Sequence, residues 1–216
     1  MQTARTSHAA WFTDSQQAQL YKLPIGSGGA LPEPDAIEVV PLSGSWMQQP
    51  GFNANGIAET PNHQALLVIQ SNTGILFRVD PETGVAAVVV LGGVVLANGD
   101  GLLVVGRTLY VVQNQVNTVA VVRLDAAGTS GELVDQRTDP AFQVPTTIAK
   151  FGNGRYLPNA RFDTPLDARH RLLGGAHRSV IVARLRAKCR VSTAEPDSEH
   201  VTIQASGEHG TTPATL

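Results

Sequence analysis

Residues 66–84, LLVIQSNTGILFRVDPETG, hold the pattern that decides the fold of this chain. The aliphatic run LLVIQ is followed by the polar turn SNTG, then by a second apolar run, ILFRV, and by the turn DPETG. Short runs rich in β-branched and aromatic residues, separated by Asn, Asp, Pro and Gly, are typical of β-strands joined by turns. The stretch therefore predicts two short strands connected by a turn.

The same arrangement occurs in two other places, at residues 10–26 (AWFTDSQQAQLYKLPIG) and at residues 109–128 (LYVVQNQVNTVAVVRLDAAG). Each copy ends its second strand with a basic residue, an aliphatic residue and a turn. A weaker fourth copy, GRYLPNARF, lies at residues 154–162. The aliphatic residues Leu20, Leu76 and Val121 correspond, which gives intervals of 56 and 45 residues between the first three copies.

A repeat of about 45 residues that contains about four strands has the size of one blade of a β-propeller. The expected blades are residues 8–44, 45–92, 93–140 and an incomplete 141–165, so the propeller domain spans residues 8–165. A β-sandwich would also consist of short strands and turns, but it would not require the same positions to recur. The sequence therefore favours an all-β fold, a partial propeller.

The composition agrees with a folded, turn-rich β protein. The 216 residues are 42% hydrophobic and 16% charged, include 21 Gly and 13 Pro, and have a formal net charge of −2. This balance gives no electrostatic reason to expect binding to nucleic acid or to a membrane surface. The single Cys189 excludes an internal disulfide and a cysteine metal cluster. The first twelve residues lack the apolar stretch of a signal peptide, so export would require a preceding segment, and the compartment is open.

The last quarter of the chain differs from the rest. Residues 163–216 contain no Phe, Trp or Tyr, but they hold four of the six His. Val180 to Leu185 is suited to a short strand or helix, and nothing after it repeats a pattern. We expect residues 166–216 to be a non-repeat, largely disordered tail. A shifted reading frame near residue 166 is the alternative explanation.

Two segments give the repeat a recognisable form, NGIAETP at residues 55–61 and NGDGL at residues 98–102. With them the chain resembles, over about residues 8–162, the senescence-marker-protein, gluconolactonase and luciferin-regenerating-enzyme-like family of six-bladed β-propellers. The pattern departs from the family at Asn62-His63-Gln64, where Asp-Gly-Lys is usual. The resemblance implies a truncated six-bladed-type propeller, with the remaining blades expected before Met1 and, if the reading frame is shifted, closing the ring after Phe162.

The resemblance also implies a site. In the family, an Asn or Asp at such a strand start faces the central channel and binds a divalent ion, often calcium; the matching residues are Asn55 and Asp100. Their oxygen atoms suit calcium, and Asp100 is also the expected catalytic residue, as ligand or general base. Asn-Gly and Asp-Gly are equally common turn formers, which is the competing interpretation. The further candidates for lining the channel are Thr146, Thr147 and Asn159.

The resemblance implies a metal-dependent hydrolase of small lactones or esters. A noncatalytic propeller that binds a small molecule or a protein is the alternative, and an inactive fragment is a third possibility. Because an open propeller has unpaired sheet edges, the chain is also expected to be capable of self-association. The substrate is expected to be a small molecule.

Overall fold

The computed structural model of the chain describes residues 2–163 and 182–185, and in these it consists almost entirely of β-strands. The only helical turns described are three short 3-10 segments, η1 (Ser27–Gly29), η2 (Pro34–Ala36) and η3 (Asn114–Val116). None of the helices in these residues has the length and apolar character needed to cross a membrane. The strands form four small sheets in a propeller-like arrangement, which confirms the all-β prediction.

The first two sheets come from residues 3–88. The first contains β1 (Thr3–Arg5), β2 (Ala9–Thr13), β3 (Gln19–Pro24) and β4 (Glu38–Pro41), paired antiparallel in that order. The second contains β6 (Ala54–Glu59), β7 (Leu66–Gln70), β8 (Ile75–Val79) and β9 (Val85–Val88), with the two-residue β5 (Ser43–Gly44) parallel to β9.

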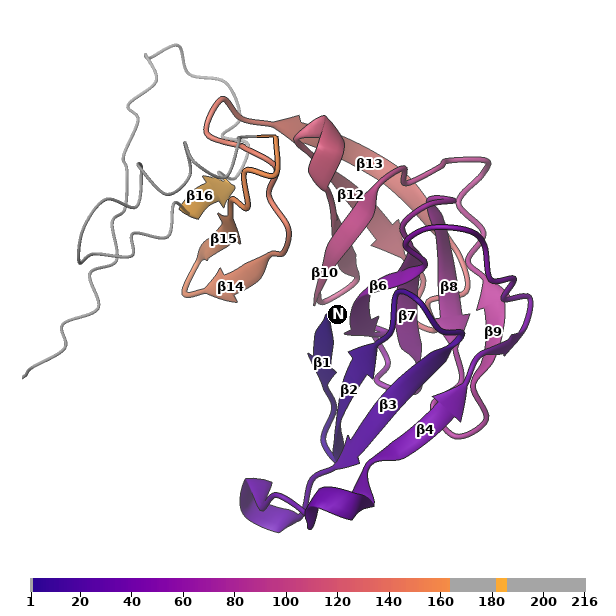
Figure 1. Cartoon of the computed structure of the whole chain (residues 1–216). Helices are drawn as coiled ribbons and strands as arrows, with labels where there is room; N and C mark the ends of the chain where they lie inside the picture. The colour runs from indigo at the N-terminus through magenta and orange to yellow at the C-terminus, as the bar shows by residue number, and fades with distance from the viewer. Residues whose placement is uncertain (1, 164–181, 186–216) are drawn as a thin grey trace, which may run out of the picture.

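The other two sheets follow the same plan. The third contains β10 (Gly99–Val105), β11 (Thr108–Gln113), β12 (Thr118–Leu124) and β13 (Gly131–Thr138). The fourth contains β14 (Ala149–Phe151), β15 (Gly154–Pro158) and β16 (Val182–Leu185). Figure 1 shows the sheets following one another around an arc, with the N-terminus beside β1, β6 and β10.

The repeat in the sequence corresponds to the second and third strands of the sheets. The first strands of the three sheets, β1, β6 and β10, are the inner strands, which lie nearest the centre of the arc. Leu20, Leu76 and Val121 lie in β3, β8 and β12, each of which is the third strand counted from the inner one. The predicted start of the first blade at residue 8 was too late, because β1 begins at Thr3 and pairs with β2. Its sequence, TAR, is too short and too polar to be recognised as a strand.

Three apolar layers hold the four sheets together, one between each pair of neighbours. The first joins Trp11, Leu20 and Val40 of the first sheet to residues such as Val68 and Phe77 of the second. The other two layers lie between the second and third sheets and between the third and fourth. Because inner sheets are covered on both sides, their strands read as continuous apolar runs, and all five residues of β7 are buried.

The predicted tail is described only at residues 182–185, where β16 pairs antiparallel with β15. Ala183 and Leu185 of β16 are buried in the third apolar layer. The expectations of disorder or of a shifted frame for the rest of residues 166–216 lie outside the described residues.

Candidate functional site

The site begins with two irregularities at equivalent places in neighbouring sheets. The pairing of β6 with β7 shifts register between Ala54 and Ile57, and the pairing of β10 with β11 shifts between Gly99 and Leu102. Asn55 and Asp100 each lie inside one of these shifts. Bulges of this kind re-aim side chains and are common beside functional sites. The two residues expected from the sequence therefore occupy corresponding, non-regular positions at the starts of inner strands.

Each of these residues is followed by a glycine that lets the next inner strand approach closely. A Cβ atom added to Gly56 would lie 1.9 Å from the carbonyl oxygen of Asp100. One added to Gly101 would lie 2.4 Å from Cα of Thr147, in the segment before β14. A side chain at either position would therefore prevent this close backbone approach. The inner strands of the second and third blades therefore meet at Gly56, and the third and fourth blades meet in the same way at Gly101. Each glycine directly follows its polar residue, Asn55 or Asp100.

Amide side chains from several blades surround the carboxyl group of Asp100. Asn114 Nδ2 donates a hydrogen bond to Oδ2 of Asp100 at 2.8 Å, and Gln2 Nε2 donates one to Oδ1 at 3.3 Å. The side chain of Asn55 also bonds to this carboxyl. We call Gln2, Asn55, Asp100, Asn114 and the segment Thr146–Thr147 the polar floor. It draws one or more residues from each of the four blades.

Burial dominates the electrostatics of the polar floor. Asp100 is only 5% exposed, and burial raises the pKa of its carboxyl group to about 6, although the hydrogen bonds from Asn114, Gln2 and Asn55 lower it in part. In contrast, the pKa values of Asp14, Asp80 and Asp125 are lowered, mainly by hydrogen bonds in exposed turns. Asp100 is thus ionised at neutral pH but is a stronger base than a surface aspartate.

The raised pKa predicts a stability that depends on Asp100 and pH. Between about pH 4 and pH 6 the folded chain keeps a proton on Asp100 that the unfolded chain has lost, so the free energy of unfolding falls as the pH rises through 6. A shift from 3.8 to about 6 corresponds to about 3 kcal/mol in all, of which about 2 kcal/mol is lost between pH 4.5 and pH 7.5. Urea denaturation at pH 4.5 and pH 7.5 should therefore show this loss in the wild type and not in Asp100→Asn. Equal losses in both proteins would contradict it.

Thr146 and Thr147 contribute different groups to the polar floor. The carbonyl oxygen of Thr146 accepts the N–H of Gly101 at 3.0 Å, and Thr147 Oγ1 donates to Gln2 Oε1 at 3.4 Å. A strained turn precedes them, because Val144 has φ 54°, a conformation that β-branched residues rarely adopt. Asn117 Oδ1 holds this turn by accepting the N–H of Val144 at 2.7 Å.

The structure uses Asn159 differently from Asn55. Its Nδ2 donates to the carbonyl of Ala141 at 2.8 Å, and its Oδ1 accepts the N–H of Gln143 at 3.0 Å. Both polar atoms of the amide thus serve the loop that precedes β14. They are not directed to Asp100.

Gln2 is the member of the polar floor that the sequence did not reveal. Its main chain is paired with Thr13, whose Oγ1 accepts the N–H of Gln2 at 2.9 Å and donates to the carbonyl of Asn55 at 2.7 Å. Asn114 was visible in the sequence only as a residue at a strand end. The available signal for Gln2 was its place before the first strand of a blade, equivalent to Asn55 and Asp100, but that strand itself was not predicted.

A cavity of about 470 Å³ lies along the inner strands, and the residues that line it follow those of the polar floor in the chain without including any of them. It is lined by residues of β1, β6, β10 and the β14 region, which is the position of the central channel in a propeller. Charged side chains also line it, and Nδ1 of His63 lies 2.8 Å from Oε2 of Glu59. The cavity has room for a small molecule.

Comparison with solved structures supports the fold. The chain is similar to the major allergen Mala s 1 of Malassezia sympodialis, with a TM-score of 0.53 and 17% identity over 76% of this chain and 50% of the allergen. It is also similar to regucalcin, a calcium-binding protein of Agrobacterium tumefaciens, with a TM-score of 0.51 and 17% identity over 76% of this chain and 54% of regucalcin. A candidate 6-phosphogluconolactonase of Bacteroides uniformis gives a TM-score of 0.51 and 14% identity, with 73% and 48% covered.

These similarities establish the architecture and no more. No known protein-family model matches the sequence, and no curated protein sequence matches it. The chain spans about half the length of the three solved structures named above. Since identities are below 20% and one fold hosts many activities, function has to be argued from the polar floor itself.

Proposed function

We propose that the chain belongs to a propeller that hydrolyses small lactones or esters at the polar floor. The observation that supports this most is the buried carboxyl of Asp100, with a pKa of about 6, at the point where the inner strand starts of four blades converge. Buried carboxyl groups with perturbed pKa values are more common at catalytic sites than elsewhere. The description of two similar structures, as a calcium-binding protein and as a candidate 6-phosphogluconolactonase, agrees with the reaction class.

In this proposal Asp100 is the general base. Its ionised carboxylate takes a proton from a water molecule as the water oxygen attacks the lactone carbonyl carbon. The ring C–O bond then breaks, and the same proton passes to the alkoxide that leaves. A pKa of about 6 suits both transfers near neutral pH. The amides of Asn114 and Gln2 orient the carboxylate, and Thr147 in turn orients Gln2.

The oxygen atoms of the polar floor are of the kind that a hard divalent cation such as calcium binds. The carboxylate of Asp100, the amide oxygens of Asn55 and Gln2 and the carbonyl of Thr146 are oxygen ligands of the type that calcium prefers. Calcium takes about six to eight such ligands, and one carboxylate supplies a single negative charge. The described residues contain no cluster of three or more His, Cys, Asp or Glu that would hold a metal. These residues would therefore bind an ion weakly. When bound, such an ion would polarise the carbonyl of the substrate.

The test compares hydrolysis by the wild-type chain with that by two matched variants. Asp100→Asn removes the base while keeping its shape, and we expect it to lower kcat at least about 100-fold. Asp139→Asn changes an exposed turn aspartate and should leave the rate unchanged. Release of acid from δ-gluconolactone and δ-valerolactone, measured with calcium and with a chelator, provides the readout. A wild-type rate equal to that of Asp100→Asn would contradict the proposal.

A noncatalytic binding function is the second candidate. It is favoured by the composition of the polar floor, in which uncharged amides surround one carboxylate, an arrangement suited to binding a polyol or another neutral ligand. Calorimetric titration with the same lactones separates the two. Binding that Asp100→Asn weakens, without turnover by the wild type, would support this alternative.

A further inference from the structure

The first sheet has one apolar face that no described residue covers. Phe12, Tyr21 and Val39 are directly paired neighbours on β2, β3 and β4, so their side chains lie on the same face. Trp11, Leu20 and Val40 alternate with them and are buried against the second sheet. We call Phe12, Tyr21, Leu23, Ile37 and Val39 the open face. Val39 and Ile37 are each 52% exposed.

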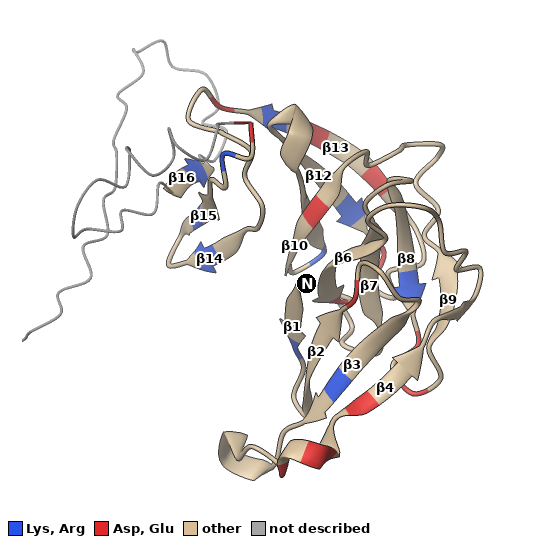
Figure 2. Ribbon diagram, viewed as in Figure 1, with Lys and Arg blue, Asp and Glu red and all other residues tan. Residues whose placement is uncertain are grey.

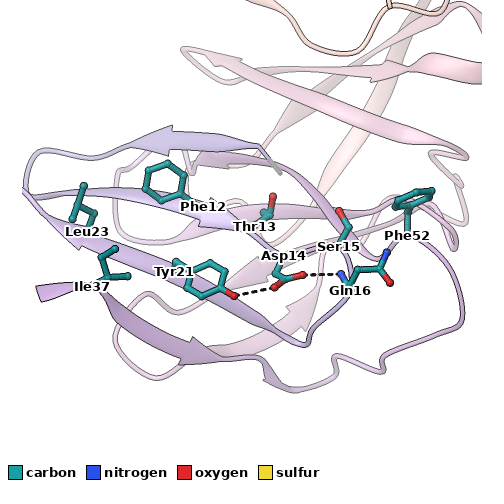
Figure 3. Close-up of a pocket in the computed structure, with 9 residues that line it drawn as sticks. All are labelled: Phe12, Thr13, Asp14, Ser15, Gln16, Tyr21, Leu23, Ile37 and Phe52. Carbon is teal, nitrogen blue, oxygen red and sulfur yellow. Dashed lines mark hydrogen bonds between the residues drawn. The ribbon is translucent and has the colours of Figure 1, made fainter. Parts of the chain in front are cut away.

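The open face is concave as well as apolar. It borders a cavity of about 710 Å³, to which the loop residue Phe52 also contributes. Figure 3 shows Phe12, Leu23, Ile37 and the ring of Tyr21 along this surface. The polar groups at its end are already satisfied, because Asp14 accepts hydrogen bonds from the hydroxyl of Tyr21 at 3.0 Å and from the N–H of Gln16 at 2.8 Å. The surface is therefore suited to apolar contact more than to polar recognition.

The rest of the molecule indicates what kind of surface fits the open face. The second, third and fourth sheets each have the equivalent face covered by the apolar face of the preceding sheet. A sheet face of the same kind is thus the natural occupant of the open face. Among the described residues, the last sheet presents one that is not covered, on the side opposite Leu157.

This outer face of the last sheet also has exposed aromatic character. Phe151 is 79% exposed and lies edge-to-face with Tyr156, with ring centroids 6.5 Å apart. Arg184 is directly paired with Tyr156 on β16, and its guanidinium lies 6.0 Å from the Tyr156 ring. We call Phe151, Tyr156 and Arg184 the outer face.

The two ends of the array also differ in charge. Strands β14, β15 and β16 contain three basic residues and no acidic one. Arg184 lies on the outer face, whereas Lys150 and Arg155 are paired with each other on the face of Leu157. The segment beside the open face carries Glu33 and Asp35, whereas Glu38 is paired with Lys22 on the other face of the sheet. Figure 2 shows basic residues on each strand of the last sheet and acidic residues at η2 and β4. An end-to-end contact would bring Arg184 of one copy to the end of the other that carries Glu33 and Asp35, which favours it over contact between two identical ends.

We propose that a second copy of this chain covers the open face, with the outer face of its last sheet packed against the first sheet. The contact is head to tail, so the four sheets described in each of two copies close into a ring of eight, the upper end of the usual range for propellers. It differs from pairing at strand edges because it buries sheet faces, as the three internal layers do. It does not depend on the proposed hydrolysis.

Two charged substitutions test this on the full-length chain by sedimentation velocity. Phe12→Asp places a charge on the open face, and Phe151→Asp places one on the outer face. Each variant should raise the dimer Kd about 30-fold or more, because the substitution weakens both contacts of the ring. Mixed in equal amounts, the two variants should form dimers again through one intact contact. Val95→Asp, at an exposed site in the loop before β10, should leave Kd unchanged. Circular dichroism verifies that all variants are folded.

Three results would overturn the proposal. The first is a wild-type chain that stays monomeric at about 100 μM, a concentration well above the Kd of a specific dimer. The second is a Phe151→Asp variant that dimerises normally while Phe12→Asp does not, since that pattern requires contact between two open faces. The third is a mixture of the two variants that remains monomeric.

Discussion

Gly56→Ala should destabilise the chain by about 3 kcal/mol or more, since neither side of the contact it disturbs can yield easily. The added methyl carbon would lie 1.9 Å from the carbonyl oxygen of Asp100, and this neighbour is backbone. To make room, β6 has to move away from β10, which breaks the contact between the second and third blades. The same movement displaces Asp100 from its amide partners, so the variant should also lose the stability change between pH 4.5 and pH 7.5.

Chemical denaturation of Gly56→Ala beside Gly26→Ala measures this effect. Gly26 lies in the loop before η1, and its added methyl would come no closer than 3.3 Å to Ala30 Cβ. The control should change the free energy of unfolding by less than about 1 kcal/mol. If Gly56→Ala were as mild as Gly26→Ala, the inner strands would not approach as closely as described.

Trp11→Ala should cost about 3–5 kcal/mol, whereas Phe12→Ala on the next residue of β2 should cost much less. Trp11 is 2% exposed and belongs to the layer between the first and second sheets. Phe12 points to the open face, where truncation leaves no internal cavity. The two variants thus remove aromatic side chains from opposite faces of one strand.

The measurement is the denaturation midpoint of both variants at a protein concentration too low for copies to associate. Similar losses for Trp11→Ala and Phe12→Ala would mean that both faces of the first sheet are buried in the isolated chain. That outcome would contradict the arrangement of the layers and would remove the open face.

The sequence predicted the hairpins well because the strands and turns of a hairpin are determined by neighbouring residues in the chain. Strands β7 and β8 are largely apolar runs with Asn72 and Gly74 between them, and β11 and β12 are similar runs with Asn114 and Asn117 between them. Strand β1 was not predicted, and β16 was predicted only as a strand or a helix, for the opposite reason. β1 has three residues with little apolar character, and β16 depends on pairing with β15, which lies more than 20 residues earlier.

The polar floor could be predicted only in part. Asn55 and Asp100 stood out because each precedes a glycine at the same place in a repeat. The register shifts that hold them are set by contact with neighbouring blades, so no local pattern shows them. Likewise, an amide such as Asn159 can serve a channel or its own loop, and only the folded arrangement decides between them.

The most direct test of the polar floor is a carbon-13 titration of the carboxyl group of Asp100 in the folded chain. The structure predicts a midpoint near pH 6, with the exposed carboxyls of Asp80 and Asp125 titrating below their ordinary value of 3.8 in the same spectra. Asn114→Leu, which removes one amide donor, should raise the Asp100 midpoint further. A midpoint at or below 3.8 would mean that burial does not dominate the pKa of Asp100 and would contradict the electrostatics described for the polar floor.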